Sequence, residues 1–138
     1  MKNEKGLEPL NCWNCGMHVR EALLQSARIR RLCGNPKKET VKVFPLVANE
    51  GTTFPFITYQ KSGGYYEYDK DVLEGGKCRV DIIVFTTGYM EMIDLADAVD
   101  DAIHAHFNNA RSVAKLSESY ENTDGDVFYE VMSFEFDI

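Results

Sequence analysis

Cys12 and Cys15, three positions apart, are the residues of this 138-residue sequence best suited to chemistry. Cys-x-x-Cys is the spacing of half a zinc site and also of a thiol redox pair. His18 could supply a third zinc ligand, and Cys33 or Cys78 a fourth. However, no second close pair follows at zinc-finger spacing, and no strand is expected before the motif, as a redox motif would need. Metal binding and redox chemistry stay open, but the pattern favours incidental thiols at a helix start.

A second group of polar side chains lies near position 100. His104 and His106 are two residues apart, so on a helix they face different sides and cannot chelate one metal ion. We expect them to form a polar or cationic helix end. Asp94, Asp97 and Asp101 follow one side of the same helix, whereas acid/base catalysis needs carboxylates that converge across a cleft. These three carboxylates are therefore expected to face solvent or a partner.

Motifs of the common enzyme classes are missing from the sequence. There is no Gly-x-Ser-x-Gly elbow, no phosphate-binding loop and no dinucleotide fingerprint. The glycine pairs at 63–64 and 75–76 lack the following helix that would make them phosphate cradles. We therefore expect no catalytic residues and no cofactor.

The composition restricts the partners. Fifteen basic and 22 acidic residues give a formal charge of -7, which disfavours tight binding along a nucleic acid backbone. An acidic surface can still serve near DNA, because it lets DNA pass without sticking. No run of about 18 apolar residues and no apolar signal segment is present, so we expect a cytosolic protein with reduced thiols and no membrane contact.

Two helices are predicted to position these side chains. Apolar residues at helical spacing predict a first helix over residues 18–33, with a basic end and a stop at Gly34 and Pro36. Residues 1–11 show no periodicity and are expected to be a flexible lead-in. The clearest pattern predicts a second helix from Tyr89 to Phe107. Its expected buried stripe contains Tyr89, Met92, Ile93, Ala96, Val99, Ile103 and Phe107.

Alternating and β-branched runs predict the strands. These runs are residues 41–46, 54–60, 77–86, 111–121 and 127–138. The first should be an edge strand because Pro45 would sit badly in a sheet centre, and Gly125 can make the turn of the last pair. The third should place Cys78, Val80 and Ile82 on one face. The expected fold is α+β, an antiparallel or mixed sheet of two β-hairpins packed on two helices, in the order α-(β)-β-β-α-β-β, within one domain over residues 1–138.

Residues 61–76 separate two of these strands and contain Tyr65, Tyr66 and Tyr68. The segment is too long for a tight turn and too aromatic for an ordinary loop. We expect a hairpin arm that reaches away from the core. Its tyrosines either pack on the chain's own sheet or form a contact surface for a partner.

Four segments share a further pattern. Residues 54–60 form a proline-aromatic strand (Phe-Pro-Phe-Ile-Thr-Tyr-Gln), and residues 78–85 an Arg-Val-centred strand (Cys-Arg-Val-Asp-Ile-Ile-Val-Phe). Residues 88–99 give a short turn and an alanine-rich helix, and residues 129–136 a closing strand of alternating apolar residues. Together they resemble the tail-completion, or tail-terminator, family of tailed bacteriophages and prophages, which is related in fold to the lambda minor tail protein U.

The resemblance implies assembly rather than catalysis. It implies an α+β subunit of a hexameric ring that ends the tail tube and helps to join head to tail. The implied partners are other copies of the chain, the tail tube protein, the head–tail connector proteins, and DNA that passes without specific binding. The implied location is the cytoplasm of the bacterial host and then the virion tail.

A ring needs contacts between two different patches of each subunit. The arm over residues 61–76, with Tyr65, Tyr66 and Tyr68, is one candidate patch. The acidic helix side, with Asp94, Asp97 and Asp101, or the basic end of the first helix is the candidate complement. The alternative function is a small zinc- or thiol-dependent regulatory or adaptor module that uses Cys12, Cys15 and His18.

Overall fold

The computed structural model describes residues 7–35, 40–107 and 114–138. Residues 1–6 of the expected lead-in, the stop at Pro36 and the first residues of the strand expected at 111 lie outside this part. The described helices are α1 (Cys15–Gln25), α2 (Ala27–Cys33) and α3 (Tyr89–Phe107). The described strands are β1 (Gly34–Asn35), β2 (Thr40–Val41), β3 (Val43–Pro45), β4 (Phe56–Asp69), β5 (Val72–Thr86), β6 (Ala114–Asp124) and β7 (Val127–Asp137).

The first predicted helix is in fact two, so the expectation of one helix over residues 18–33 was wrong. The break is at Ser26, whose backbone is extended with φ -75° and ψ 115°. Its hydroxyl oxygen accepts a hydrogen bond from the Ile29 N–H (3.2 Å), which makes Ser26 the N-cap of α2. Serine favours such caps because its side chain competes for backbone donors. The break directs α2 toward α3.

The bounds predicted for the second helix are confirmed by α3, but its buried stripe differs in part. Tyr89 and Ile93 were expected to be buried, yet they are 45% and 42% exposed. Because α3 packs on α1 and α2 as well as on the sheet, its buried face is centred on different residues than expected. The buried residues are Met92, Leu95, Ala98, Val99, Ala102, Ile103 and Phe107.

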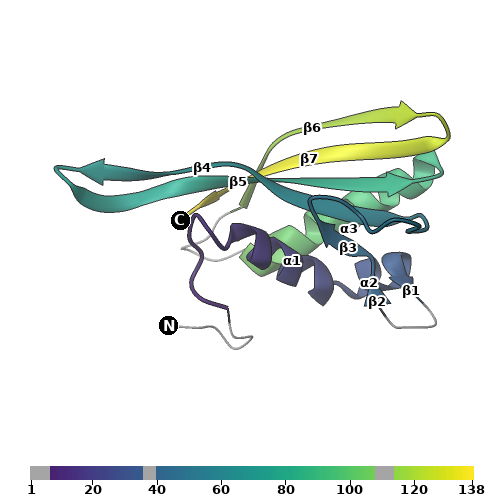
Figure 1. The fold of residues 1–138 in the computed structure, drawn as a ribbon, viewed down its shortest axis with the longest axis horizontal. Coiled ribbons are helices and arrows are strands. Elements are labelled where there is room, and N and C mark those ends of the chain that lie inside the picture. The colour runs from purple at the N-terminus through teal and green to yellow at the C-terminus, as the bar shows by residue number, and fades with distance from the viewer. Residues whose placement is uncertain (1–6, 36–39, 108–113) are drawn as a thin grey trace.

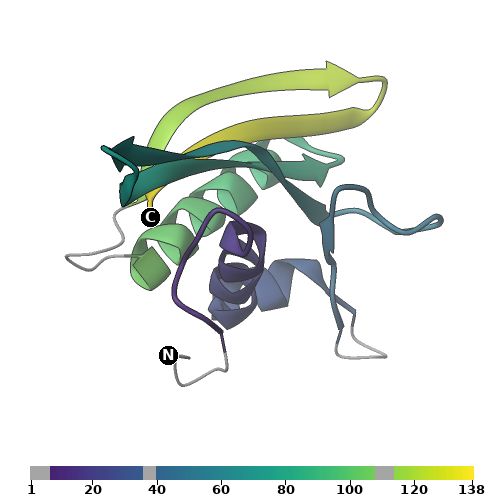
Figure 2. The same ribbon diagram turned by 60° about the vertical axis from the view of Figure 1, so that its left-hand side comes forward.

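The main sheet has five strands in the order β3-β4-β5-β7-β6. β3 runs parallel to β4, and the other neighbours are antiparallel, so the sheet is mixed and the α+β prediction is confirmed. β1 and β2 form a separate pair beside α2. The three helices cover one face of the sheet (Figure 2). Cys78, Val80 and Ile82 point to that face and are buried, as predicted.

In both hairpins the paired strands reach closer to the turn than the sequence predicted. β4 and β5 pair from Phe56 and Phe85 out to Asp69 and Val72, whereas β7 joins β5 only from Lys77 onward. The outer part of this hairpin is therefore a two-stranded ribbon that projects beyond the body (Figure 1). We call residues 61–76 the arm. The second hairpin closes through two residues, with Gly125 at φ 61°, rather than through a five-residue loop.

Candidate functional site

The arm is exposed along most of its length. Its tip, which we define as residues 67–74, carries apolar side chains in solvent: Tyr68 is 65% exposed, Val72 62% and Leu73 55%. Four carboxylates and one lysine in the tip give it a net charge of -3. The sequence predicted a hairpin arm here and singled out Tyr68, but it did not single out Val72 and Leu73.

The other two tyrosines of the arm have different surroundings. Tyr65 is exposed and lines a shallow hollow together with Lys77 and Arg79. Tyr66 is half-buried, and its hydroxyl oxygen accepts a hydrogen bond from the Cys12 N–H (3.1 Å). Tyr66 therefore ties the arm to the N-terminal segment, while Tyr65 and Tyr68 remain available for contact.

The segment before α1 braces the base of the arm. Lys61 Nζ donates to the Cys12 carbonyl oxygen (3.0 Å) and lies 4.6 Å from the centre of the Trp13 ring, a cation–π distance. A Cβ atom at Gly64 would lie 2.7 Å from Cys12 Sγ, so the close approach of the arm to this segment requires glycine there. Cys12 is thus a contact between the N-terminal segment and the arm.

Three thiols lie near the base of the arm, two from the N-terminal Cys-x-x-Cys pair and one from β5. Cys12, Cys15 and Cys78 are all buried, and Gly64 packs between Cys12 and Cys78. A hydrogen bond from Cys78 lowers the pKa of Cys15 to about 7. The same interaction, with burial, raises the pKa of Cys78. Cys33 lies elsewhere, near Lys42, and burial raises its pKa to about 12.

His18 does not join these thiols in a metal site. Its Nε2 lies 2.8 Å from the Glu8 carbonyl oxygen, which can only accept, so Nε2 carries the proton. Its ring packs near the rings of His106 and Phe107, with centroid distances of 5.8 and 6.3 Å. Within residues 7–35, 40–107 and 114–138, no group of three or more His, Cys, Asp or Glu side chains could hold a metal ion.

The acidic side of α3 is bound by an arginine of the same chain. Arg28 of α2 contacts Asp94 through Nη2, and its Nη1 lies 2.9 Å from Asp97 Oδ2 and 3.6 Å from Asp101 Oδ2. These carboxylates raise the pKa of Arg28. The sequence missed this contact because it depends on the break at Ser26. The negative charge of these α3 carboxylates, which were predicted to face solvent or a partner, is therefore partly neutralised within the subunit.

The two histidines of α3 face different surroundings, as their spacing predicted. His104 Nδ1 lies 2.9 Å from the Asp100 carbonyl oxygen, one turn earlier, and 3.3 Å from its carboxylate. Its ring approaches Phe134 edge-on, at 6.4 Å between centroids. His106 instead packs against Phe107. Neither arrangement brings the two imidazoles to a common ligand.

The sheet face opposite the helices carries a row of aromatic rings. Phe54 stacks on Phe56 (5.2 Å between centroids), Phe56 on Phe85 (4.8 Å), and Phe85 lies 5.9 Å from Tyr129. We call these four residues the aromatic row. They share a face because Phe56, Phe85 and Tyr129 are paired across β4, β5 and β7. The next paired residues on this face, Thr58, Ile83, Val131 and Tyr120, are also largely apolar.

The far half of the same face is polar. Asp81 accepts hydrogen bonds from the hydroxyls of Ser133 (2.7 Å) and Ser62 (3.2 Å). Arg79 contacts Asp81 at 3.7 Å and forms a closer ion pair with Glu118. Along β5 the polar residues Arg79 and Asp81 on this face precede the apolar Ile83 and Phe85. The apolar half lies at the opposite end of the sheet from the arm.

A hollow of about 320 Å³ lies between α3 and the second hairpin. Tyr89 Oη donates to Glu121, whose carboxylate oxygens lie 3.0 and 3.1 Å away. Burial and the nearby Glu121 raise the pKa of Glu130. A tyrosine and a carboxylate bonded to each other leave no free base aimed into this hollow, so its geometry does not favour catalysis.

Comparison with known proteins identifies related chains. A family model described as "Tail completion protein gp17" matches residues 17–132. A chain of the solved structure "Virion of native gene transfer agent (GTA) particle" is similar over 89% of this chain and 92% of that chain, with a TM-score of 0.66 and 16% sequence identity. The comparison with curated proteins gave no match. In the described residues, no helix has the length and apolarity that crossing a bilayer requires.

Proposed function

The chain belongs to the tail completion protein gp17 family and has a structural role in a phage tail, and we propose that it acts as one subunit of a ring that ends the tail tube. The proposed ring has six copies. It would stop growth of the tube and present a surface to which the head can be joined. This is a function of assembly, with no catalytic step.

The observation that carries the ring is the arm. A two-stranded ribbon with an exposed apolar tip is marginal on its own, because isolated hairpins have little independent stability. Exposed Tyr68, Val72 and Leu73 would gain stability by packing on another surface. The arm projects away from its own body, so that surface belongs to another molecule (Figure 1).

Closed rings arise when one patch of a subunit meets a different patch of the next. The arm supplies the first patch. Of the two complements considered from the sequence, the acidic side of α3 is already bound to Arg28 and repels an arm tip of charge -3. The basic end of α2, with exposed Arg30 and Arg31, has the matching sign. The charges therefore favour the α2 end of a neighbour over its acidic α3 side, so the arm tip should approach the neighbour from that end.

The remaining partners follow from this position at the end of the tube. The ring would contact the tail tube protein on one side and head–tail connector proteins on the other. DNA would pass through its channel without specific binding, and a chain charge of -7 is compatible with such passage. The subunit would be made in the cytoplasm of the bacterial host before it enters the tail.

The alternative, a zinc- or thiol-dependent module, has less support from the geometry. His18 presents a protonated Nε2 to the Glu8 carbonyl oxygen, so this nitrogen is not free to bind zinc. Cys12 and Cys15 contact the arm and Cys78 instead. Metal analysis of the purified protein decides between the two functions. Stoichiometric zinc, with unfolding on chelation, would support the module.

Measurement of mass in solution, alone and with tail tubes, tests the ring. We expect a species of six times the 15.7 kDa subunit mass at high concentration or at tube ends. The variants Val72→Asp and Leu73→Asp should remain monomeric, while Met17→Asp, an equally exposed change on α1, should assemble normally. A wild-type chain that stays monomeric in both settings contradicts the proposal.

A further inference from the structure

We propose that the aromatic row is the docking site for the arm tip of the next copy of this chain. This inference rests on the proposed ring and adds the acceptor surface that the ring requires. The sheet face that carries the row has no helix over it among the described residues (Figure 2). Apolar sheet faces are normally covered by another layer.

The row has the apolar character of a surface that is covered in the assembled state. Phe54 is exposed, and Phe56, Phe85 and Tyr129 are each partly exposed. Ile83, which is also partly exposed, extends the patch on the neighbouring pair of the same face, where its partner Val131 is buried. Burial of such aromatic side chains is worth roughly 25 cal/mol for each Å² removed from water. Exposed aromatic rings are not needed in a channel wall that lets DNA slide, whereas they are typical of an interface between subunits.

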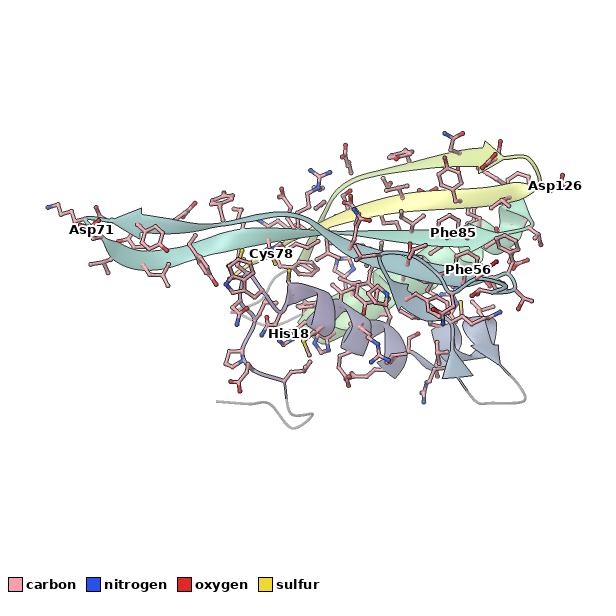
Figure 3. All side chains as sticks on the ribbon, in the orientation of Figure 1. His18, Phe56, Asp71, Cys78, Phe85 and Asp126 are labelled. Atoms are coloured by element: carbon pink, nitrogen blue, oxygen red, sulfur yellow. The ribbon has the colours of Figure 1, made fainter. Side chains whose placement is uncertain are left out.

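The arm tip and the aromatic row lie at opposite ends of the molecule. Figure 3 places Asp71, in the arm tip, at one end of the long axis, and Phe56, Phe85 and Asp126 toward the other. The tip therefore cannot fold back onto the row of its own chain. A neighbour placed head to tail brings the two surfaces together, and each copy then uses both.

The dimensions of the two surfaces are compatible. A strand rises about 3.3 Å per residue, so the eight residues from Gly63 to Lys70 extend the arm by roughly 25 Å. Neighbouring strands are about 4.8 Å apart, so the row spans roughly 10–15 Å across β4, β5 and β7. The tip can therefore lie across the row while the two bodies remain side by side.

Charge determines which end of the row the tip approaches. The tip has a net charge of -3, and Asp124 and Asp126 lie in the second hairpin at the far edge of the sheet. At the near edge, Lys42 Nζ lies 3.0 Å from the carbonyl oxygen of Thr53, the residue before Phe54. The helix α2, which carries Arg30 and Arg31 in its last turn, also lies toward this end of the molecule (Figure 1). The tip should therefore contact the Phe54 end of the row.

Engineered cysteines test this contact in the full-length chain. The variants Leu73→Cys in the tip and Phe54→Cys in the row each place one thiol at an exposed position, while the four native cysteines are buried. The two variants are mixed in equal amounts and oxidised with oxidised glutathione. Docking holds the paired thiols at a high effective concentration, so the heterodimer should exceed either homodimer by roughly tenfold or more.

A matched control uses Met17→Cys in place of Phe54→Cys, because Met17 is also exposed but lies on α1, on the opposite face of the sheet. This mixture should give no excess of heterodimer. An equal excess with Met17→Cys, or no excess with Phe54→Cys while the wild type has the mass of a ring, overturns the docking site and leaves the ring intact. A wild type that never assembles overturns the ring as well.

Discussion

Gly76→Ala is expected to disrupt the arm without unfolding the body. Gly76 pairs with Tyr66 at the base of the projecting ribbon. A Cβ atom at position 76 would lie 2.1 Å from the Tyr65 carbonyl oxygen and 2.8 Å from Tyr66 Cα. These are backbone atoms, so no side chain can rotate away to relieve the contact. The two strands must separate instead.

The size of the effect follows from that distance. Carbon and oxygen atoms of neighbouring strands normally stay about 3.3 Å apart, so the strands must open by roughly 1 Å. Overpacking of this kind costs about 1–3 kcal/mol. A free two-stranded hairpin has little stability to lose, and each 1.4 kcal/mol lowers its paired population about tenfold. The outer arm should therefore spend much of its time unpaired, whereas β5 beyond Lys77 stays held by β7.

Amide hydrogen exchange measures this change residue by residue, because exchange reports local opening. Protection should fall in residues 66–73 and remain in β7 and α3. The matched control is Gly63→Ala in the same arm, where an added Cβ meets no atom within 4 Å. That change should be neutral, or should stabilise the arm by about 0.4–1 kcal/mol by restricting the unfolded chain. Wild-type protection of residues 66–73 in Gly76→Ala would refute this reasoning.

Three further predictions concern the body. Ser26→Ala removes the cap of α2 and should lower the free energy of unfolding by about 1 kcal/mol in urea titrations. Ser26→Asp should preserve the cap and therefore the free energy of unfolding. Arg28→Ala should lower the melting temperature at low salt, and the loss should shrink in about 1 M salt, since exposed ion pairs are screened; an unchanged loss would contradict this account. Cys78→Ala should raise the pKa of Cys15 from about 7, seen as thiolate absorbance. Because that pKa is lowered on folding, the stability it contributes is present above the ordinary thiol pKa and is lost as the pH falls through about 7. This loss should be absent in Cys78→Ala.

Local patterns predicted the helices and strands where packing agrees with periodicity. The bounds of α3 followed from apolar residues at steps of three and four, and β5 from alternation. The break at Ser26 was not predicted, because the apolar spacing continues through it and a single cap decides the outcome. The salt bridges of Arg28 depend on that break, so they were missed for the same reason.

The candidate surfaces were only partly predictable, since they depend on strand pairing. The arm tyrosines could be identified in the sequence. Val72 and Leu73 could be assigned to an exposed tip only from the structure, in which the paired strands extend to Asp69 and Val72. Cys78 rather than His18 joins Cys12 and Cys15, because register sets that contact.

The aromatic row left a signal in the sequence that could have been used. Apolar residues occupy both alternating positions at the end of β5, where Ile83 and Phe85 interleave with Ile82 and Val84. A strand with one solvated face carries polar residues at every second position. The apolar second face therefore predicts a covering layer, and none of the helices in the described part of the chain lies there.

The central claim, that this chain ends the tail tube, is tested most directly by electron microscopy of tails made without it. In a phage or prophage that encodes the chain, its deletion should give tubes of irregular length that are not joined to heads. Wild-type protein should restore uniform, joined tails, and Leu73→Asp should not. Tails of normal length joined to heads in the absence of the chain would contradict the account.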